Sequence, residues 1–295
     1  MDKKRVLVLG GTGMLGQMVY QVLSQSVGLT VKCTSRSQSS DVLCFNVEDG
    51  TGWLQQILER YGPFDYIVNC IGVVKAHIDE RDSDSVRRAI VVNALFPHQL
   101  ATVAAVSKAR VIQPSTDGVF SGDSDEPYLE DAQHDCVDIY GKTKSLGEVH
   151  KSGFLNIRCS IVGPDPIEKK GLLEWFIAQR EDTTIVGYTD HLWNGVTTLQ
   201  FAELCQKIIQ EDAFDKIWDE SPVHHFCPNR PLSKFELLEI FKSVFKKTVT
   251  IKPTRSPNGA LRRILATRYQ SLLMLYGCDL SMEQAVQALS TLGAE

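Results

Sequence analysis

The sequence predicts an α/β fold in which a doubly wound parallel sheet is joined to a smaller, mixed C-terminal lobe. Short apolar, β-branched runs alternate with helical stretches through the first half of the chain, which is the pattern of a parallel sheet. This pattern breaks after Arg158, where a stretch rich in glycine and proline begins. With 295 residues, 43% of them hydrophobic, the chain can bury a large core.

The first half of the chain contains the elements of this sheet in order. The expected strands are six short apolar runs at residues 6–9, 29–34, 42–45, 66–70, 111–114 and 155–158. Helical patterns separate them at residues 14–26, 52–61, 83–106 and 140–149. Each is long enough to cross over the sheet, so we expect right-handed βαβ connections.

The second half of the chain is less regular. Helical patterns recur at residues 172–179, 199–210 and 232–245. The proline-containing stretches at 222–231 and 253–257 are typical of loops. We assign residues 1–162 and about 186–220 to the sheet domain, and about 163–185 and 221–295 to a substrate-binding lobe.

Composition excludes several function classes. The net charge is −5, and acidic and basic residues are mixed along the chain, so neither a nucleic-acid partner nor a membrane surface is expected. The apolar run at residues 6–9 is too short for a secretory signal or a membrane span, which favours a cytoplasmic protein. The eight cysteines form no C-x-x-C pair and no metal-ligand spacing, so we expect reduced thiols and no metal site.

A glycine-rich turn follows the first predicted strand. Its sequence is Gly10-Gly11-Thr12-Gly13-Met14-Leu15-Gly16, and it opens the first predicted helix. Glycines allow a tight turn here, and they let the backbone approach a pyrophosphate at the N-terminus of the helix. The motif in this context is typical of a Rossmann-type dinucleotide site, although an isolated glycine cluster could simply build a strand-to-helix turn.

The end of the second predicted strand indicates which dinucleotide binds. An Asp or Glu at this place would bind the ribose 2′-hydroxyl and repel a 2′-phosphate. The chain instead has Ser35-Arg36-Ser37, in which a guanidinium flanked by hydroxyls can bind a phosphate. This favours NADP(H) over NAD, with a solvated surface arginine as the alternative interpretation.

One tyrosine has a lysine four residues later and is a candidate proton donor. Tyr140 and Lys144 stand four residues apart in a helical stretch, so their side chains share a face, and the lysine charge should favour the phenolate. Thr116 follows the fifth predicted strand at the sheet edge where ligands of open α/β folds bind. Carbonyl reduction needs a proton donor and a donor to the developing alkoxide, and Tyr140 and Thr116 can supply them.

With these motifs in place, the chain resembles the extended short-chain dehydrogenases/reductases, and within them the sugar-nucleotide reductases similar to dTDP-4-dehydrorhamnose reductase. The resemblance spans most of the chain. The residues that carry it are Gly10–Gly16, Val68-Asn69-Cys70-Ile71-Gly72, Val92-Asn93-Ala94-Leu95-Phe96-Pro97, Ser115-Thr116-Asp117-Gly118-Val119-Phe120, Tyr140-Gly141-Lys142-Thr143-Lys144 and Arg158–Gly163.

This resemblance implies roles for individual residues. Thr116, Tyr140 and Lys144 would form the catalytic group, with NADP(H) as cofactor, a nucleotide-linked 4-keto-6-deoxy sugar as substrate and a homodimer as a possible assembly. Further cofactor contacts would come from Asn46, Val47, Cys70, Ile71, Gly72 and Asn93. Further substrate contacts would come from Lys75, Asp117 and Gly118. Gly118 stands where the rhamnose-forming enzymes usually carry an aromatic residue.

The second half of the chain offers further candidate substrate residues. The segment His191–Thr198 resembles a substrate-facing segment of these reductases, in which Trp193 would stack on a sugar or base while Asn194 and Thr197 form hydrogen bonds. A tryptophan packed between the lobes is the alternative. Arg262 or Arg263 would bind the diphosphate of the substrate, unless both lie on a solvated basic face.

The same fold supports other functions, so the site residues must decide among them. A 4,6-dehydratase of this family typically has a glutamate after its Thr-Asp pair, and Gly118 cannot move protons. A 4-epimerase retains NAD, which fits poorly with Arg36. A non-catalytic, cofactor-binding regulatory subunit is the alternative from another class, although Thr116, Tyr140 and Lys144 are all present.

Overall fold

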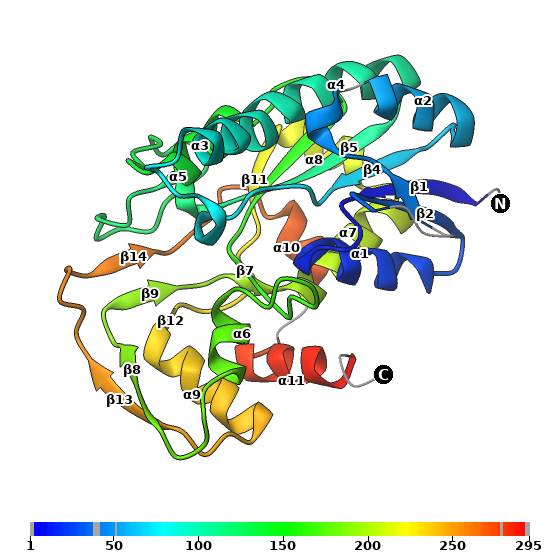
Figure 1. The fold of residues 1–295 in the computed structure, drawn as a ribbon. Coiled ribbons are helices and arrows are strands. Elements are labelled where there is room, and N and C mark those ends of the chain that lie inside the picture. The colour runs from blue at the N-terminus through cyan, green and yellow to red at the C-terminus, as the bar shows by residue number, and fades with distance from the viewer. Residues whose placement is uncertain (1–2, 38–41, 51, 278–279, 293–295) are drawn as a thin grey trace.

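The computed structural model describes residues 3–37, 42–50, 52–277 and 280–292. Its centre is a seven-stranded parallel sheet with the order β11-β6-β5-β4-β1-β2-β3 (Figure 1). The strands are β1 (Lys4–Leu9), β2 (Leu29–Ser35), β3 (Val42–Cys44), β4 (Tyr66–Asn69), β5 (Arg110–Ser115), β6 (Phe154–Arg158) and β11 (Val223–His225). Because the order runs outward from β1 in both directions, the sheet is doubly wound, which confirms the predicted fold class.

The first strand shows why these segments are continuous apolar runs. Val6 and Val8 on β1 belong to one hydrophobic core, whereas Leu7 and Leu9 belong to another. Alternate residues of a strand face opposite sides, so a sheet buried on both faces needs apolar residues at every position. All six predicted runs coincide with a strand to within two residues.

Helices cover both faces of the sheet. α1 (Met14–Ser24) and α7 (Thr198–Gln210) pack in the first core, and α2 (Gly52–Tyr61) and α4 (Phe96–Ser107) pack in the second. Figure 1 shows α2 and α4 on the opposite side of the sheet from α1 and α7. The same domain contains α3 (Ser83–Ala89), α5 (Ile139–Leu146) and α8 (Phe214–Glu220), and the short helices η1 (Val47–Asp49), η2 (Lys75–His77) and η4 (Asp117–Val119).

One helix contains a wide turn beside the predicted site. α3, the π-helical segment η3 (Ile90–Leu95) and α4 run continuously from Ser83 to Ser107. Pro97 has no N–H, and in a regular α-helix its ring would clash with the Asn93 carbonyl, so the wide turn relieves this clash. The Asn93 carbonyl instead approaches Gly147, where a Cβ would lie 1.9 Å from the oxygen.

The same helix is apolar as well as long. Within the described residues it alone is long and apolar enough, by length and composition, to cross a membrane, at 25 residues. However, 56% of its most apolar window is buried inside the fold, and Phe96 and Leu100 pack in the second core. These contacts are those of a core helix that covers a sheet.

The second lobe is smaller and mixed, as predicted. β8 (Thr184–Tyr188) pairs with β13 (Thr250–Thr254), and β9 (His191–Trp193) lies between β12 (Leu232–Ser233) and β14 (Leu261–Arg263). β7 (Ile161–Val162) and β10 (Val196–Thr197) form a separate parallel pair. The helices of the lobe and the C-terminal segment are α6 (Leu172–Ile177), α9 (Lys234–Phe245), α10 (Ser271–Tyr276) and α11 (Met282–Leu292).

The sheets divide the chain differently from the predicted boundaries at two places. Residues 186–193, which were assigned to the sheet domain, pair with strands of the small lobe through β8 and β9. Residues 223–225, which were assigned to the lobe, form the edge strand β11 of the central sheet. Strands of three residues carry too little periodicity to indicate which sheet they join.

Candidate active site

The glycine turn has the geometry that a bound pyrophosphate needs. Gly10 has a φ of +75°, and a Cβ at Gly16 would lie 2.0 Å from the Gly10 carbonyl oxygen, so both positions require glycine. Gly13 precedes α1, whose first turn has no side-chain cap. The N–H groups of that turn are therefore free for a phosphate. The other residues of the predicted set lie in the same turn: Thr12, Met14 and Leu15.

The residues predicted to recognise the cofactor ribose lie beside this turn at the carboxyl end of β2. The Thr34 hydroxyl accepts a hydrogen bond from the Gly10 N–H at 3.1 Å, which ties the two segments together. The Ser37 N–H donates to the Ser35 hydroxyl at 3.1 Å. The Arg36 side chain is 61% exposed and its guanidinium lies 3.4 Å from the Glu168 carboxylate. A phosphate could reach this arginine from solvent.

The remaining predicted cofactor residues surround the same edge. Asn46 caps η1 by accepting the Glu48 N–H at 3.3 Å, and Val47 packs in the second core. At the end of β4, the Cys70 N–H donates to the Leu9 carbonyl at 3.0 Å. Two more predicted residues follow Cys70 in the chain: Ile71 and Gly72. A Cβ at Gly10 would lie 2.9 Å from the side chain of the first of them. Burial raises the pKa of the Cys70 thiol, which therefore stays protonated.

Asn93 holds the chain segment that follows β4. Its side-chain oxygen accepts the Val73 N–H at 2.8 Å, and its amide donates to the Val73 carbonyl at 2.8 Å. The same amide donates to the Thr143 hydroxyl at 3.3 Å, which links this segment to α5. Asn93 therefore supports the cofactor edge through the backbone, and its direct contact with a cofactor stays a prediction.

The structure brings the three predicted catalytic residues together at the carboxyl end of β5. Thr116 follows the strand, and Tyr140 and Lys144 lie one turn apart on α5. The side chains of Tyr140 and Thr116 both border Gly118 and lie close together. The Thr116 hydroxyl donates to the Asp117 carboxylate at 3.2 Å and accepts the Gly118 N–H at 3.0 Å. The Lys144 ammonium donates to the Pro114 carbonyl at 2.9 Å, which places it at the end of β5, two residues before Thr116.

The pKa of Tyr140 moves in the opposite direction from the one expected from its lysine neighbour. Burial raises it to about 12, and the negative charge of Asp117 adds to this shift, while the hydrogen bond with Thr116 opposes it. Lys144 directs its ammonium to a backbone carbonyl, and burial lowers its own pKa to about 8. Tyr140 is therefore a neutral phenol, which is the form that can donate a proton.

The residues after Thr116 complete the floor of this site. Asp117 is buried, and burial raises its pKa, while the nearby Arg263 charge opposes that shift. A Cβ at Gly118 would lie 3.0 Å from the ring of Tyr140 and 3.2 Å from the Thr116 hydroxyl. A larger residue at this position would have to displace the phenol, so the glycine leaves the space that the Tyr140 ring occupies.

The two candidate arginines of β14 have different surroundings. Arg263 is close enough to Asp117 and Tyr140 to shift the pKa of both, and its Nε is buried without a hydrogen-bond partner. Arg262 instead forms an ion pair with Asp125 on the protein surface. Alternate residues of a strand face opposite sides, so only one of the pair can reach the catalytic group.

The lysine predicted to contact substrate lies near the start of α5. The Lys75 ammonium is 2.7 Å from the Asp138 carboxylate, which also caps α5 by accepting the Gly141 N–H at 2.8 Å. The Lys75 side chain is largely exposed. It can therefore reach a ligand only if it gives up or shares this ion pair.

The segment after β9 has a different character. Asn194 is buried, and its side chain both donates to the Leu265 carbonyl at 2.7 Å and accepts the Leu265 N–H at 2.9 Å. Thr197 is fully buried and caps α7 together with Gln200. Trp193 is half-buried against the first core. The geometry of Asn194 and Thr197 does not support the predicted substrate contacts, because their polar atoms already bind protein.

A buried ion pair that the sequence did not predict lies behind the three predicted catalytic residues. Arg158 binds both carboxylate oxygens of Glu148, at 2.8 and 2.7 Å, and Ser115 donates to the same carboxylate at 2.6 Å. These hydrogen bonds hold the pKa of Glu148 low despite its burial. The Glu148 charge also favours the protonated form of Lys144. Its position four residues after that lysine was the available signal.

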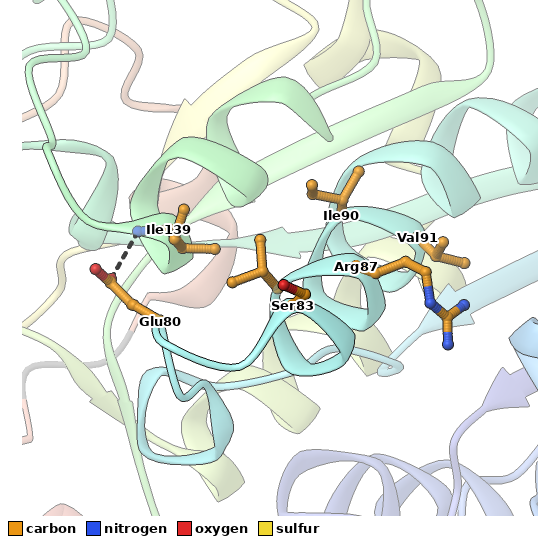
Figure 2. Close-up of a pocket in the computed structure, with 7 residues that line it drawn as sticks. Glu80, Ser83, Arg87, Ile90, Val91 and Ile139 are labelled. Carbon is orange, nitrogen blue, oxygen red and sulfur yellow. Dashed lines mark hydrogen bonds between the residues drawn. The ribbon is translucent and has the colours of Figure 1, made fainter.

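A pocket of about 470 Å³ lies beside α3, and Ile139, the neighbour of Tyr140 in the chain, forms part of its lining. It is lined by α3, η3 and the start of α5, and Figure 2 shows Ile90 and Ile139 on its walls with Glu80 bonded to the Ile139 N–H. Within the described part of the chain, no group of His, Cys, Asp and Glu side chains could hold a metal, and the described cysteines are free.

Comparison with known proteins places the chain in a family. The model of the RmlD substrate binding domain family matches residues 4–264. The chain belongs to this family. Among curated relatives, it is 30% identical over 272 residues to methionine adenosyltransferase 2 subunit beta of Xenopus laevis, covering 88% of this chain and 78% of that protein. It is 31% identical to dTDP-4-dehydrorhamnose reductase of Mycolicibacterium smegmatis over 49% of this chain and 40% of that enzyme.

Solved structures of other proteins confirm the fold over nearly all of this chain. A dTDP-4-dehydrorhamnose reductase from Clostridium acetobutylicum superposes with a TM-score of 0.76 at 20% identity, covering 99% of this chain and 100% of that one. The same enzyme from Bacillus anthracis, solved in complex with NADP, has a TM-score of 0.75 at 20% identity, covering 98% and 99%. An epimerase from Helicobacter pylori has a TM-score of 0.73 at 15% identity, covering 98% of this chain and 96% of that one. Fold likeness therefore does not select the reaction.

Proposed function

We propose that the protein is an NADPH-dependent reductase that converts the keto group of a nucleotide-linked 4-keto-6-deoxy sugar into a hydroxyl, in polysaccharide or deoxysugar biosynthesis. The observation that carries this proposal is that Tyr140 and Thr116 lie together against Gly118, with Lys144 one turn away on α5. The glycine turn and Arg36 lie at the same edge of the sheet. Membership of the family and its sugar-nucleotide reductases support the substrate class.

The residues of the site have separable tasks in this reaction. NADPH, when bound, supplies the hydride. The Thr116 hydroxyl donates to its neighbour Asp117 at 3.2 Å and would have to turn from that carboxylate to donate to the substrate oxygen. The neutral Tyr140 phenol can donate the proton that this oxygen needs. The pKa of Lys144 is about 8, so its ammonium is mostly protonated below that pH and can stabilise the phenolate that is left. The Arg36 guanidinium can bind the 2′-phosphate of the cofactor.

Arg263 is the better candidate for the substrate's charged groups. Its side chain lies near Asp117 and Tyr140, and its Nε has no hydrogen-bond partner. An arginine fork with an unpaired N–H suits a diphosphate or a sugar hydroxyl. We assign the substrate contact to Arg263 rather than Arg262, which already pairs with Asp125.

A regulatory subunit is the second candidate function. It is favoured by the similarity to methionine adenosyltransferase 2 subunit beta over 88% of the chain. A subunit of this kind needs to bind a cofactor but needs no proton donor. The presence of Thr116, Tyr140 and Lys144 together at the carboxyl end of β5 supports the reductase instead.

Steady-state assays distinguish these functions. The purified protein is incubated with NADPH and a panel of nucleotide-linked 4-keto-6-deoxy sugars, and the products are identified. We expect one NADPH to be consumed for each 4-hydroxy product. Binding of NADPH without turnover of any ketosugar would favour the regulatory subunit. Isomerised sugar with NADPH unconsumed would favour an epimerase.

A further inference from the structure

The segment between β7 and α6 links the small lobe to the cofactor edge of the sheet. We call residues 163–171 the strap. It leaves β7 and leads into α6, and its residue Glu168 contacts residues that follow β2 and β4.

The Glu168 carboxylate lies between the side chains of Arg36 and His77, with the Lys170 ammonium 3.9 Å away. One oxygen lies 3.4 Å from the Arg36 guanidinium, and the other lies 3.0 Å from the His77 ring. β2 and β4 are the two neighbours of β1, so these partners stand on either side of the strand that carries the glycine turn. The carboxylate therefore occupies the edge that the sequence predicts for the adenosine end of the cofactor.

Buried carboxylates fix the backbone that presents Glu168. Asp165 accepts the N–H groups of Ile167 and Glu168 at 3.3 and 3.1 Å, and that of Lys170 at 3.4 Å. The Asp165 N–H in turn donates to the buried Glu174 of α6 at 2.8 Å. The strap thus has a defined shape, and the position of Glu168 follows from it.

We propose that Glu168 is a specificity-determining residue that sets how strongly the site prefers a cofactor with a 2′-phosphate. Its carboxylate pairs with Arg36 until a 2′-phosphate replaces it, and it then retains His77. A phosphate carries more charge and more acceptor oxygens than a carboxylate, so it wins this competition. NADH has no group to replace the carboxylate and leaves the Arg36 pair in place. The inference rests on the proposed use of NADPH.

The size of the effect follows from exposure. Both Arg36 and Glu168 are solvent-exposed, and such pairs contribute little. Removing the Glu168 charge should therefore strengthen binding of a 2′-phosphate about two- to fivefold. The same change should leave ligands without this phosphate nearly unaffected.

Calorimetric titration with two fragments tests the proposal without turnover. Adenosine 2′,5′-bisphosphate carries the 2′-phosphate, and adenosine 5′-phosphate lacks it. The variants are Glu168→Gln, Arg36→Ala, the double variant, and Glu59→Gln as a matched control on the exposed face of α2. We expect Glu168→Gln alone to tighten the bisphosphate, and we expect this gain to vanish in the Arg36→Ala background.

The outcomes separate the two proposals. If Arg36→Ala weakens the bisphosphate but Glu168→Gln behaves like Glu59→Gln, the role of Glu168 is overturned and the cofactor assignment stands. Equal tightening of both fragments by Glu168→Gln would also overturn it, because the residue would then act as a general negative charge. If Arg36→Ala leaves the bisphosphate affinity unchanged, the NADPH assignment fails, and the role of Glu168 fails with it.

Discussion

The catalytic edge of β5 and α5 and the segment after β9 were both predicted to contact ligands, yet they differ in how their polar atoms are used. At the catalytic edge, Thr116 caps η4 and donates only to its neighbour Asp117 at 3.2 Å. Lys144 donates one N–H to a backbone carbonyl, and the Nε of Arg263 has no partner. After β9, both polar groups of the Asn194 side chain bind the Leu265 backbone, and Thr197 caps a helix.

Residue type and position therefore do not by themselves assign a function. A hydroxyl or amide can act on a ligand only with hydrogen-bonding capacity that the protein has left free. On this criterion the catalytic edge should respond to substitution mainly through turnover. The segment after β9 should respond mainly through stability.

The largest expected effect is on turnover at the catalytic edge. Tyr140→Phe removes the proposed proton donor but keeps the ring, so turnover of the ketosugar should fall about 100- to 10,000-fold with cofactor affinity nearly unchanged. Steady-state kinetics and calorimetric titration measure the two quantities. Near-normal turnover in folded Tyr140→Phe protein would place the acid elsewhere.

The counterpart after β9 is a loss of stability. Asn194→Ala leaves the buried N–H and carbonyl of Leu265 without partners, so the free energy of unfolding should fall by about 2–4 kcal/mol. Denaturant unfolding gives this value, with the exposed loop variant Asn258→Ala as the control. If Asn194→Ala instead raised KM while leaving stability intact, the two regions would be alike.

Neighbouring arginines of β14 sharpen the contrast within one strand. Arg263→Met should lower kcat/KM about 10- to 100-fold, because it removes a charge beside Asp117 and Tyr140. Arg262→Met removes only a surface ion pair and should change kcat/KM less than twofold. Equal effects of both variants would contradict the assignment of Arg263.

The smallest expected effect is the pH dependence set by Lys144. Its pKa of about 8 lies below its usual value, so the ammonium loses its proton as the pH rises through this value. Tyr140, with a pKa of about 12, stays protonated across the same range. The reduction rate should therefore be steady below about pH 8 and decline above it.

A conservative variant checks the origin of this decline. Arginine stays protonated across the whole range, so the residual activity of Lys144→Arg should not decline above about pH 8. A wild-type profile that is flat to about pH 10 would show that the Lys144 charge is not needed. A decline that persists in Lys144→Arg would assign the titration to another group.

The sequence predicted long elements and local motifs better than short elements and distant pairs. β1 and α2 could be found from periodicity, and Tyr140 and Lys144 from their spacing on one helix face. β11 has three residues, so its place in the central sheet depends on partners that no local pattern reveals. Arg36 and Glu168 are 132 residues apart, and only the folded chain brings them together.

The buried pair of Glu148 and Arg158 lies between these cases. Both residues lie near the ends of predicted elements, Glu148 in the helical pattern at 140–149 and Arg158 in the strand at 155–158, but a charged residue at such an end is usually solvated. Their mutual hydrogen bonds depend on how α5 packs beside β5 and β6. The same limit applies to the pKa of Tyr140, because its burial outweighs the neighbouring lysine and burial is a property of the whole fold.

The central claim is that the Tyr140 and Thr116 pair serves the transfer of a hydride from NADPH to a sugar carbonyl. Stereospecifically deuterated NADPH, incubated with the purified protein and a nucleotide-linked 4-keto-6-deoxy sugar, tests it directly by mass spectrometry and NMR of the product. We expect one deuterium on the former carbonyl carbon, on a single face of the ring. A product without deuterium, formed while NADPH remains unconsumed, would contradict it.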